Sequence, residues 1–186
     1  MDDRERLSSL LARLSYRHGT FTLASGKTSS FYVDVKQTVM TAEGTALIGR
    51  LLFQKLHEAG MTSVGGMAVG AVPLVTATLA AAHAAGEPLQ GFFVRREAKD
   101  HGTARRIDGR FDSAARIALV EDVVTTGEST LQALDAVEAA GGKVSLVVTV
   151  VDRMEDDGLA RLAGRAGRAE ALVTKLDVER AAERRR

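Results

Sequence analysis

Two adjacent carboxylates followed by a run of small hydroxylated residues form the most chemically suggestive stretch of this chain. In RIALVEDVVTTGEST, residues 116–130, an apolar segment leads directly into Glu121 and Asp122. Residues 125–130 then predict a glycine-containing turn at the start of a helix. Unpaired backbone N–H groups and the helix dipole bind phosphate at such a turn, and carboxylates beside it can accept hydrogen bonds from vicinal hydroxyls. The combination predicts a site for a ribose 5-phosphate.

Known phosphate-binding loops have other patterns. The chain contains neither G-x-x-x-x-G-K-[ST] nor G-x-G-x-x-G after an expected strand. The sequence therefore argues against a P-loop nucleotide hydrolase and against a dinucleotide-binding protein. A simpler interpretation stays open, in which residues 125–130 cap a helix and the two acids are solvated. The pair of acids directly before the turn favours the ligand site.

A second candidate segment is FFVRREAKDHGTARRIDGRF, residues 92–111, which gathers cations around Gly102. These cations are Arg95, Arg96, Lys99, His101 and Arg105. Little apolar content anchors the segment, so we expect a mobile loop. Such a loop suits a polyanionic leaving group, because cationic donors stabilise developing charge most strongly when water is excluded. A plain solvated loop is the alternative.

The elements that must position these residues alternate along the chain. Residues 42–59 have leucines at helical spacing, with Thr41 as a candidate N-cap and Gly60 as the stop. Pro73 opens an Ala-rich helix that ends near Gly86. Apolar runs predict strands at residues 63–69, 89–95, 116–122 and 143–153, and a further helix covers residues 131–142.

Strands that are apolar on both faces and separated by helices predict right-handed crossovers. The predicted fold class is therefore α/β, with a parallel central sheet flanked by helices, and ligands are expected beyond the carboxyl ends of the strands. Residues 21–38 alternate around a Ser-Gly-Lys turn and predict a small N-terminal antiparallel hood. We expect residues 1–186 to form one domain, with the hood mainly in residues 1–40.

Composition limits the class of protein. The chain has 186 residues, no cysteine and a formal net charge of +1. The lack of cysteine excludes disulfides and thiol catalysis and favours a cytoplasmic location. The small net charge argues against nucleic acid as a partner, and no apolar segment is long enough to span a membrane. The basic end, ERAAERRR, is expected to be a solvated, frayed tail.

The stretch E-D-V-V-T-T-G-E-S-T, residues 121–130, closely resembles the signature with which type I phosphoribosyltransferases bind 5-phosphoribosyl 1-diphosphate. Within that class, R-R-E-A-K-D-H-G, residues 95–102, resembles the catalytic loop of the orotate phosphoribosyltransferases. Three more segments match that family in the same order: FTLASGKTSSFYVD, GGMAVGAVPLV and VVDR. The resemblance covers roughly residues 18–153.

The resemblance implies an activity and a set of roles. The reaction joins orotate to 5-phosphoribosyl 1-diphosphate, with Mg²⁺, and yields orotidine 5-monophosphate and diphosphate in pyrimidine biosynthesis. The implied catalytic residues are Lys99, His101 and Asp122. The residues implied to bind 5-phosphoribosyl 1-diphosphate are Arg95, Arg96, Lys99, His101, Glu121, Asp122, Val123, Val124, Thr125, Thr126, Gly127, Glu128 and Ser129. Those implied to contact orotate are Thr125 and Arg153.

In this family the loop closes over the site of the neighbouring subunit, which implies a homodimer. Mg²⁺ keeps its waters and shares substrate oxygens, so we expect no metal ligand directly from the protein. No Ser-His-Asp or Cys-His nucleophile is recognisable. None is needed if an already anionic pyrimidine nitrogen attacks a ribosyl cation-like transition state, because positioning and charge stabilisation then carry the catalysis.

Two positions depart from the family pattern. Arg96 stands where many relatives have lysine, which keeps the charge but replaces a point donor by a planar fork. Ala24 also stands where many relatives have lysine, and Lys27 lies three residues later. Lys27 is a candidate substitute that would contact orotate, and an ordinary turn lysine is an equally open interpretation. Phe31 and Tyr32 either line the base pocket or simply pack.

Other functions compete with this interpretation. One is a phosphoribosyltransferase for another base; Arg153 and the K-D-H-G loop favour an acidic pyrimidine instead. Another is a non-catalytic regulator that senses 5-phosphoribosyl 1-diphosphate, which we would expect to lack the cationic loop or to add a DNA-binding module. A plain nucleotide-binding α/β module leaves the cationic loop unexplained.

Overall fold

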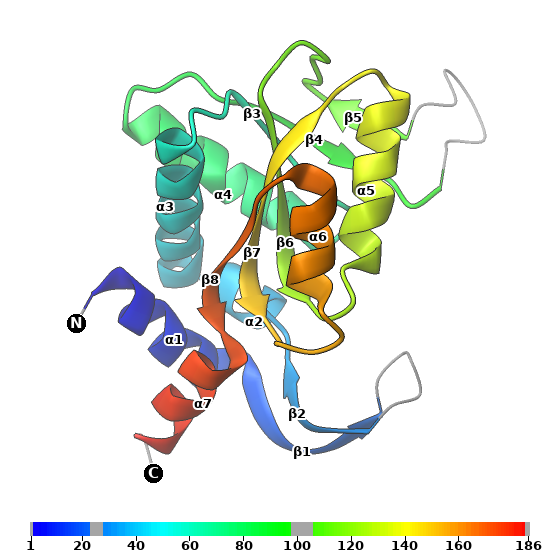
Figure 1. Ribbon diagram of the computed structural model, residues 1–186. Coiled ribbons are helices and arrows are strands. Elements are labelled where there is room, and N and C mark those ends of the chain that lie inside the picture. The colour runs from blue at the N-terminus through cyan, green and yellow to red at the C-terminus, as the bar shows by residue number, and fades with distance from the viewer. Residues whose placement is uncertain (1, 23–27, 98–105, 185–186) are drawn as a thin grey trace.

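The fold is built on a six-stranded, mostly parallel sheet, seen in a computed structural model that describes residues 2–22, 28–97 and 106–184 (Figure 1). The strands run in the spatial order β5-β4-β3-β6-β7-β8. Their bounds are β3 (Ser63–Gly65), β4 (Gln90–Val94), β5 (Ile107–Gly109), β6 (Ile117–Val124), β7 (Val144–Asp152) and β8 (Ala169–Thr174). Only β5 is antiparallel to its neighbour, β4. The predicted α/β class with a parallel central sheet is confirmed.

Helices cover both faces of this sheet (Figure 1). One face carries α3 (Ala42–Glu58) and α4 (Ala71–Ala84), and the other carries α5 (Glu128–Ala139) and α6 (Gly158–Ala166). The first four residues of the central strand β6 are apolar because both faces of the strand are buried. Ala118 and Val120 pack into the core on the α3/α4 side, whereas Ile117 and Leu119 pack into the core on the α5/α6 side.

Local sequence sets the ends of the predicted helices. The hydroxyl of Thr41 accepts a hydrogen bond from the Gly44 N–H and caps the start of α3, and Gly60, with a φ of +67°, follows its end. Helix α4 begins at Ala71, so Pro73 lies in its first turn, where a missing N–H costs little.

No helix in the described part of the chain is both long and apolar enough to cross a membrane.

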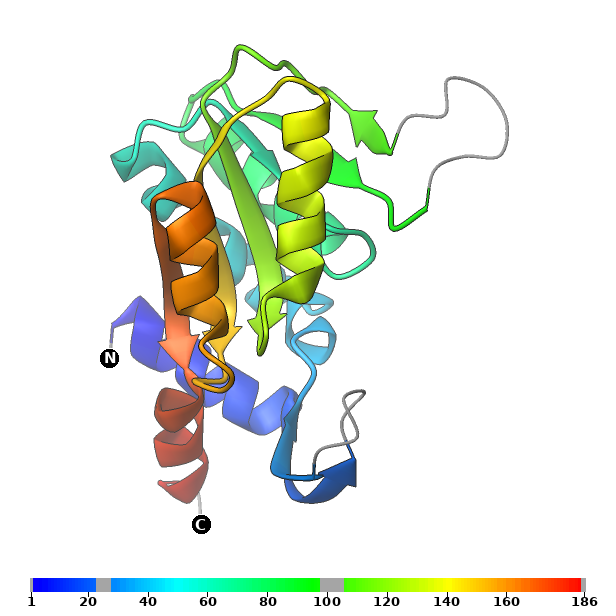
Figure 2. The ribbon, with the colours of Figure 1, turned by 45° about the vertical axis from the view of Figure 1, so that its right-hand side comes forward.

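The predicted antiparallel hood is present. Strands β1 (Tyr16–Thr22) and β2 (Thr28–Val33) form a separate two-stranded sheet beneath the carboxyl ends of the central strands (Figure 2). Helix α1 (Asp3–Leu14) precedes this hairpin and packs against α7 (Lys175–Glu183) and α3, and the short α2 (Lys36–Val39) follows it.

Three expectations need correction. Strand β6 extends past the acids to Val124, because it pairs with β7 as far as Asp152. Part of the basic segment is not a loop, because residues 107–109 form β5 against β4. The C-terminal end is not a frayed tail as far as it is described, because α7 reaches Glu183 and buries apolar side chains beside α1.

Candidate active site

Strands β6, β7 and β8 end at the same edge of the sheet, and the residue that follows each strand lies at that edge. Val124 of β6 pairs with Asp152 of β7, and Asp152 pairs with Thr174 of β8. The next residues are Thr125, Arg153 and Lys175, so these three form a row along the carboxyl edge. Figure 2 shows the strands ending together above the β1–β2 hairpin. This is the edge where an open α/β sheet binds ligands.

Glu121 turns its carboxyl group toward α5. Its residue is only 6% exposed, and the hydroxyl of Thr130 donates a hydrogen bond to Oε2 at 2.8 Å. Burial, together with the negative charge of Asp122, raises the pKa of Glu121 to about 8. Glu121 therefore keeps its proton to a higher pH than an ordinary glutamate does.

Asp122 turns to the opposite side of β6, as the alternation of a strand requires. The Nζ of Lys36 donates to its Oδ2 at 3.2 Å, and the N–H of Val123 donates to its Oδ1 at 2.9 Å. A Cβ built on Gly70 would lie 3.0 Å from the carboxyl carbon, so a glycine leaves the space that this carboxylate fills. Besides these separate partners, the carboxyl groups of Glu121 and Asp122 interact with each other.

The turn after β6 has the geometry of an anion site. Gly127 adopts the left-handed conformation, with a φ of +76°, and immediately precedes α5. Helix α6 supports the turn from the side: Arg161 donates to the carbonyl oxygen of Thr126 at 2.7 Å, and Gly158 packs directly on the carbonyl of Thr125. The start of α5 is therefore held in place and directs its first N–H groups toward the carboxyl edge.

Arg153 is a buried cation at the same edge. It is 5% exposed, and its Nε donates to Oε2 of Glu155 at 3.1 Å. Its guanidinium carbon lies 4.3 Å from the ring centroid of Phe31, a residue of the hood, and the Nζ of Lys175 lies 4.1 Å from the same centroid. Phe31 is fully packed, with 1% exposure, whereas its neighbour Tyr32 is exposed. The hood and the sheet edge are joined through this ring.

The base of the basic segment is a short hairpin. Arg95 follows β4, and its Nε contacts Oδ2 of Asp108 in β5 at 2.5 Å. The backbone N–H of Arg95 donates to the carbonyl of Arg106 at 2.7 Å, which closes the hairpin. Arg96 is exposed beyond it. Three predicted site residues, Lys27, Lys99 and His101, lie outside the described residues.

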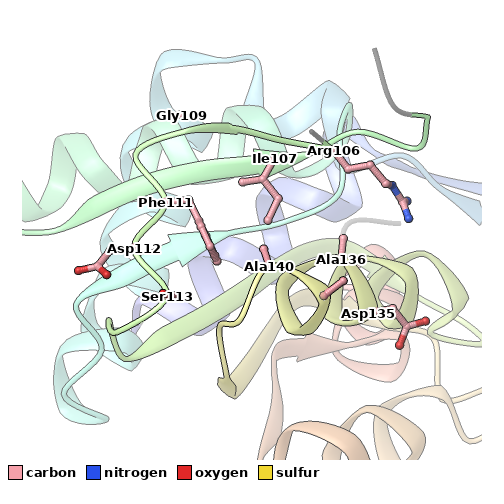
Figure 3. Close-up of a pocket in the computed structure, with 10 residues that line it drawn as sticks. Arg106, Ile107, Gly109, Phe111, Asp112, Ser113, Asp135, Ala136 and Ala140 are labelled. Carbon is pink, nitrogen blue, oxygen red and sulfur yellow. The ribbon is translucent and has the colours of Figure 1, made fainter. Parts of the chain in front are cut away.

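A separate cleft of about 990 Å³ lies between the β5 hairpin and the second half of α5. Figure 3 shows Ile107 and Phe111 pointing from the β5 side toward Ala136 of α5 and Ala140, which directly follows that helix. None of the residues that line this cleft is a predicted substrate ligand. The predicted site is instead defined by the strand ends and the hood.

Several residues at the site were not predicted from the sequence. These are Lys36, Gly158, Arg161 and Lys175. Each one contacts a residue from a distant part of the chain, so no local motif marks it. Gly70 lies in the segment GGMAVGAVPLV noted in the sequence, but its approach to Asp122 was not predicted.

No protein-family model matches the chain, but individual relatives are closely similar. The orotate phosphoribosyltransferase of Mycobacterium avium is 44% identical over 149 residues, which cover 80% of this chain and 82% of the relative. The enzyme of the same name from Bradyrhizobium sp. (strain BTAi1) is 41% identical over 168 residues, covering 88% and 90%.

Solved structures agree. A crystal structure of Mycobacterium tuberculosis orotate phosphoribosyltransferase in complex with Fe(III) dicitrate superimposes with a TM-score of 0.83 at 38% identity, covering 95% of this chain and 99% of that one. A structure of the same enzyme in complex with 5-phospho-alpha-D-ribosyl 1-diphosphate gives a TM-score of 0.76 at 34% identity, covering 96% and 99%. With the strand-end site, the hood and these similarities in agreement, the chain belongs to the orotate phosphoribosyltransferase family.

Proposed function

We propose that this chain transfers the ribose 5-phosphate of 5-phosphoribosyl 1-diphosphate to orotate and so forms orotidine 5-monophosphate and diphosphate. The observation that carries the proposal is the row at the carboxyl edge. The phosphate turn follows β6, and the buried cation Arg153 follows the adjacent β7 in the matching register. A sugar phosphate and an acidic base therefore have neighbouring partners on one rigid sheet.

The sugar phosphate would occupy the end of β6. The turn of residues 123–129 would bind the 5-phosphate through its backbone N–H groups and hydroxyls. Asp122 would accept hydrogen bonds from the ribose hydroxyls, because its carboxylate is oriented and partly exposed. Glu121 lies deeper and is tied to α5 by Thr130. Its carboxyl group interacts with that of Asp122, and the two acids would lie along the ribose.

Orotate would lie beside the end of β7. Its carboxylate suits Arg153, because a planar guanidinium forms paired hydrogen bonds to a planar acid. The stack on Phe31 and the contact with Glu155 already fix the direction of this side chain. Thr125 would contact the ring from the neighbouring strand. Lys27 remains a candidate for a second cationic contact.

The diphosphate would be bound by Arg95, Arg96, Lys99 and His101 of the basic segment. Among the described residues, no group of three or more His, Cys, Asp and Glu is placed to hold a metal ion. The oxygens of the substrates suit a hard cation that keeps most of its waters, so the protein need not supply a ligand directly. Mg²⁺ carried by the diphosphate would supply positive charge for the leaving group.

In the reaction, the bond from C1 of the ribose to the diphosphate oxygen breaks, and the diphosphate leaves with the electron pair. A bond forms between C1 and the anionic ring nitrogen of orotate. The chain's residues hold both partners in line and stabilise charge on each side, with no covalent intermediate.

We also propose that the enzyme works as a homodimer with the basic segment shared across subunits. The absence of cysteine supports a reducing compartment, and we propose the cytoplasm.

Loss of orotate absorbance in a mixture of purified protein, Mg²⁺, 5-phosphoribosyl 1-diphosphate and orotate tests this function. We expect turnover that requires all three additions and stops when EDTA removes the metal. Uracil, adenine and hypoxanthine in place of orotate are the controls for base preference, and their turnover is followed by the release of diphosphate. Turnover with one of these bases and none with orotate would contradict the substrate assignment, and no turnover with any base would favour the non-catalytic regulator.

A further inference from the structure

Lys36 joins the hood to the acid of the central strand. Its Nζ lies 3.1 Å from Oδ1 of Asp34 and 3.2 Å from Oδ2 of Asp122, which is 86 residues away in the sequence. Lys36 is the first residue of α2, and Asp34 and Val35 separate it from the second strand of the hairpin. The family signature in residues 121–130 does not include it.

The surroundings show that this contact is a charged one. The side chains of Asp34 and Asp122 are 18% and 16% exposed, and that of Lys36 is 50% exposed. Burial alone would lower the pKa of the Lys36 ammonium group. The attraction of Asp122 and the hydrogen bonds to both carboxylates outweigh burial and raise it. Lys36 therefore stays protonated beside Asp122.

The contact also fixes how Asp122 is oriented. One carboxylate oxygen accepts from Lys36 and the other from the N–H of Val123, while Gly70 lies close to the carboxyl group. An ionised carboxylate can accept about four hydrogen bonds, so positions remain for a diol. The carboxylate is thus held in one direction before a ligand arrives.

We propose that Lys36 is a positioning residue for the binding of 5-phosphoribosyl 1-diphosphate, acting through Asp122. It holds the carboxylate in the direction that accepts the ribose hydroxyls. It also offsets a negative charge that would otherwise repel the phosphate and diphosphate groups of the substrate. This inference rests on the proposed function and adds a residue from the hood to the sugar site.

A purely structural role for Lys36 predicts different behaviour. If Lys36 only pins the hood to the sheet through Asp34, its loss would loosen the whole hood. Phe31, which stacks on the proposed orotate ligand Arg153, belongs to that hood. The KM for orotate and the stability would then change together with the KM for 5-phosphoribosyl 1-diphosphate. Loss of Asp34 would produce the same pattern.

The test compares Lys36→Met, Lys36→Arg and Asp34→Asn with Lys55→Met. Lys55 is a matched control because it forms a comparable ion pair with Glu170, at 3.2 Å, on a different part of the surface. For each variant, the KM of both substrates, kcat and the urea midpoint are measured. The dissociation constant for 5-phosphoribosyl 1-diphosphate is measured by calorimetry without orotate.

For Lys36→Met we expect the KM and dissociation constant for 5-phosphoribosyl 1-diphosphate to rise about 10-fold, as loss of one charge-assisted hydrogen bond predicts. The KM for orotate should stay within about twofold. Lys36→Arg should recover most of the affinity, because it keeps the charge. Asp34→Asn and Lys55→Met should bind 5-phosphoribosyl 1-diphosphate like the unaltered protein.

Three results would overturn the role of Lys36: unchanged affinity in Lys36→Met, an equal loss in Lys36→Arg, or the same loss in Asp34→Asn. If Lys36→Met is too unstable to assay, Lys36→Gln takes its place, and the comparison with Lys36→Arg and Asp34→Asn is unchanged. If the unaltered protein fails to bind 5-phosphoribosyl 1-diphosphate, the proposed function fails as well. Binding that is indifferent to Lys36 overturns this inference alone.

Discussion

The hydroxyl of Thr130 donates a hydrogen bond of 2.8 Å to the buried carboxyl group of Glu121. Thr130 lies in the first turn of α5, and Glu121 lies near the end of β6. The contact therefore ties the helix that follows the phosphate turn to the strand that carries both acids. A substitution at either residue should change both the free energy of unfolding and the affinity of the proposed ligand site.

The raised pKa of Glu121 predicts a pH-dependent stability. Below the ordinary pKa of 4.5, Glu121 is protonated in both the folded and the unfolded chain, so it causes no pH dependence. Between 4.5 and about 8 the unfolded chain loses this proton and the folded chain keeps it. The free energy of unfolding should therefore fall as pH rises through this window, by up to about 1.4 kcal/mol per pH unit.

Glu121→Gln should remove this part of the pH dependence and keep the hydrogen bond from Thr130. Urea unfolding at several pH values measures the difference between the variant and the unaltered chain. Glu87→Gln is the matched control, because Glu87 is exposed. Parallel curves for Glu121→Gln and the unaltered chain would show that Glu121 ionises normally.

Replacement of Arg153 should weaken orotate selectively. Arg153→Lys keeps the charge but loses the planar fork and the stack on Phe31. We expect the KM for orotate to rise about 10-fold or more, with little change in the KM for 5-phosphoribosyl 1-diphosphate. Arg165→Lys is the control, since Arg165 forms exposed ion pairs with Asp135 and Glu138. An unchanged KM for orotate in Arg153→Lys would remove Arg153 from the base site.

Two glycines of the same helix offer a matched pair for the phosphate turn. A Cβ on Gly158 would overlap the carbonyl oxygen of Thr125, whereas a Cβ on Gly164 would meet nothing within 4 Å. Gly158→Ala should shift the turn, raise the KM for 5-phosphoribosyl 1-diphosphate and cost about 1–3 kcal/mol of stability. Gly164→Ala should stabilise the chain by about 0.5–1 kcal/mol without a kinetic effect. Equal kinetics in the two variants would show that the turn is not part of the sugar-phosphate site.

Sharing of the basic segment across a dimer can be tested by complementation. Lys99→Ala and Asp122→Asn should each lower kcat about 100-fold or more and leave the fold intact. Lys143→Ala, at an exposed lysine, is the control. If the segment acts in the neighbouring site, a mixed dimer of the two variants has one site with both defects and one with neither. An equal mixture, after subunit exchange, should then regain about a quarter of full activity.

Activity that stays at the level of the separate variants would show that each subunit uses its own basic segment. Exchange itself is confirmed by native mass spectrometry of variants of different mass. Full activity in Lys99→Ala alone would remove Lys99 from the mechanism, whatever the arrangement of subunits.

The sequence predicted the parts of the fold whose signals are local. The N-cap Thr41, the leucine spacing and Gly60 delimit α3 within a residue, and apolar runs identify the central strands. Alternation along β6 also predicted that Glu121 and Asp122 are not both surface charges on one side, and Glu121 is buried. Long-range pairing between strands determines where the strands end: β6 extends to Val124 because it pairs with β7 there.

The region after β7 was not predicted, for physical reasons. Its turn places Met154, Asp156 and Asp157 at positive φ. Positive φ is uncommon for residues other than glycine, so the sequence gives little indication of this turn. Helix α6 and strand β8 are short, and α7 depends on packing against α1 at the other end of the sequence. Lys36 meets Asp122 for the same kind of reason, since a turn in the hood and the end of a central strand share no local pattern.

The matching ends of β6, β7 and β8 separate the proposed tasks among strands. The proposed sugar-phosphate site follows one strand and the proposed base ligand Arg153 follows the next, so a change at Arg153 leaves the backbone of the phosphate turn in place. Exchange of the side chain at position 153 is therefore expected to alter the choice of nucleobase while the ribose half of the substrate remains bound as before. The sheet edge thereby provides a ready starting point for laboratory evolution of new nucleotide-forming enzymes.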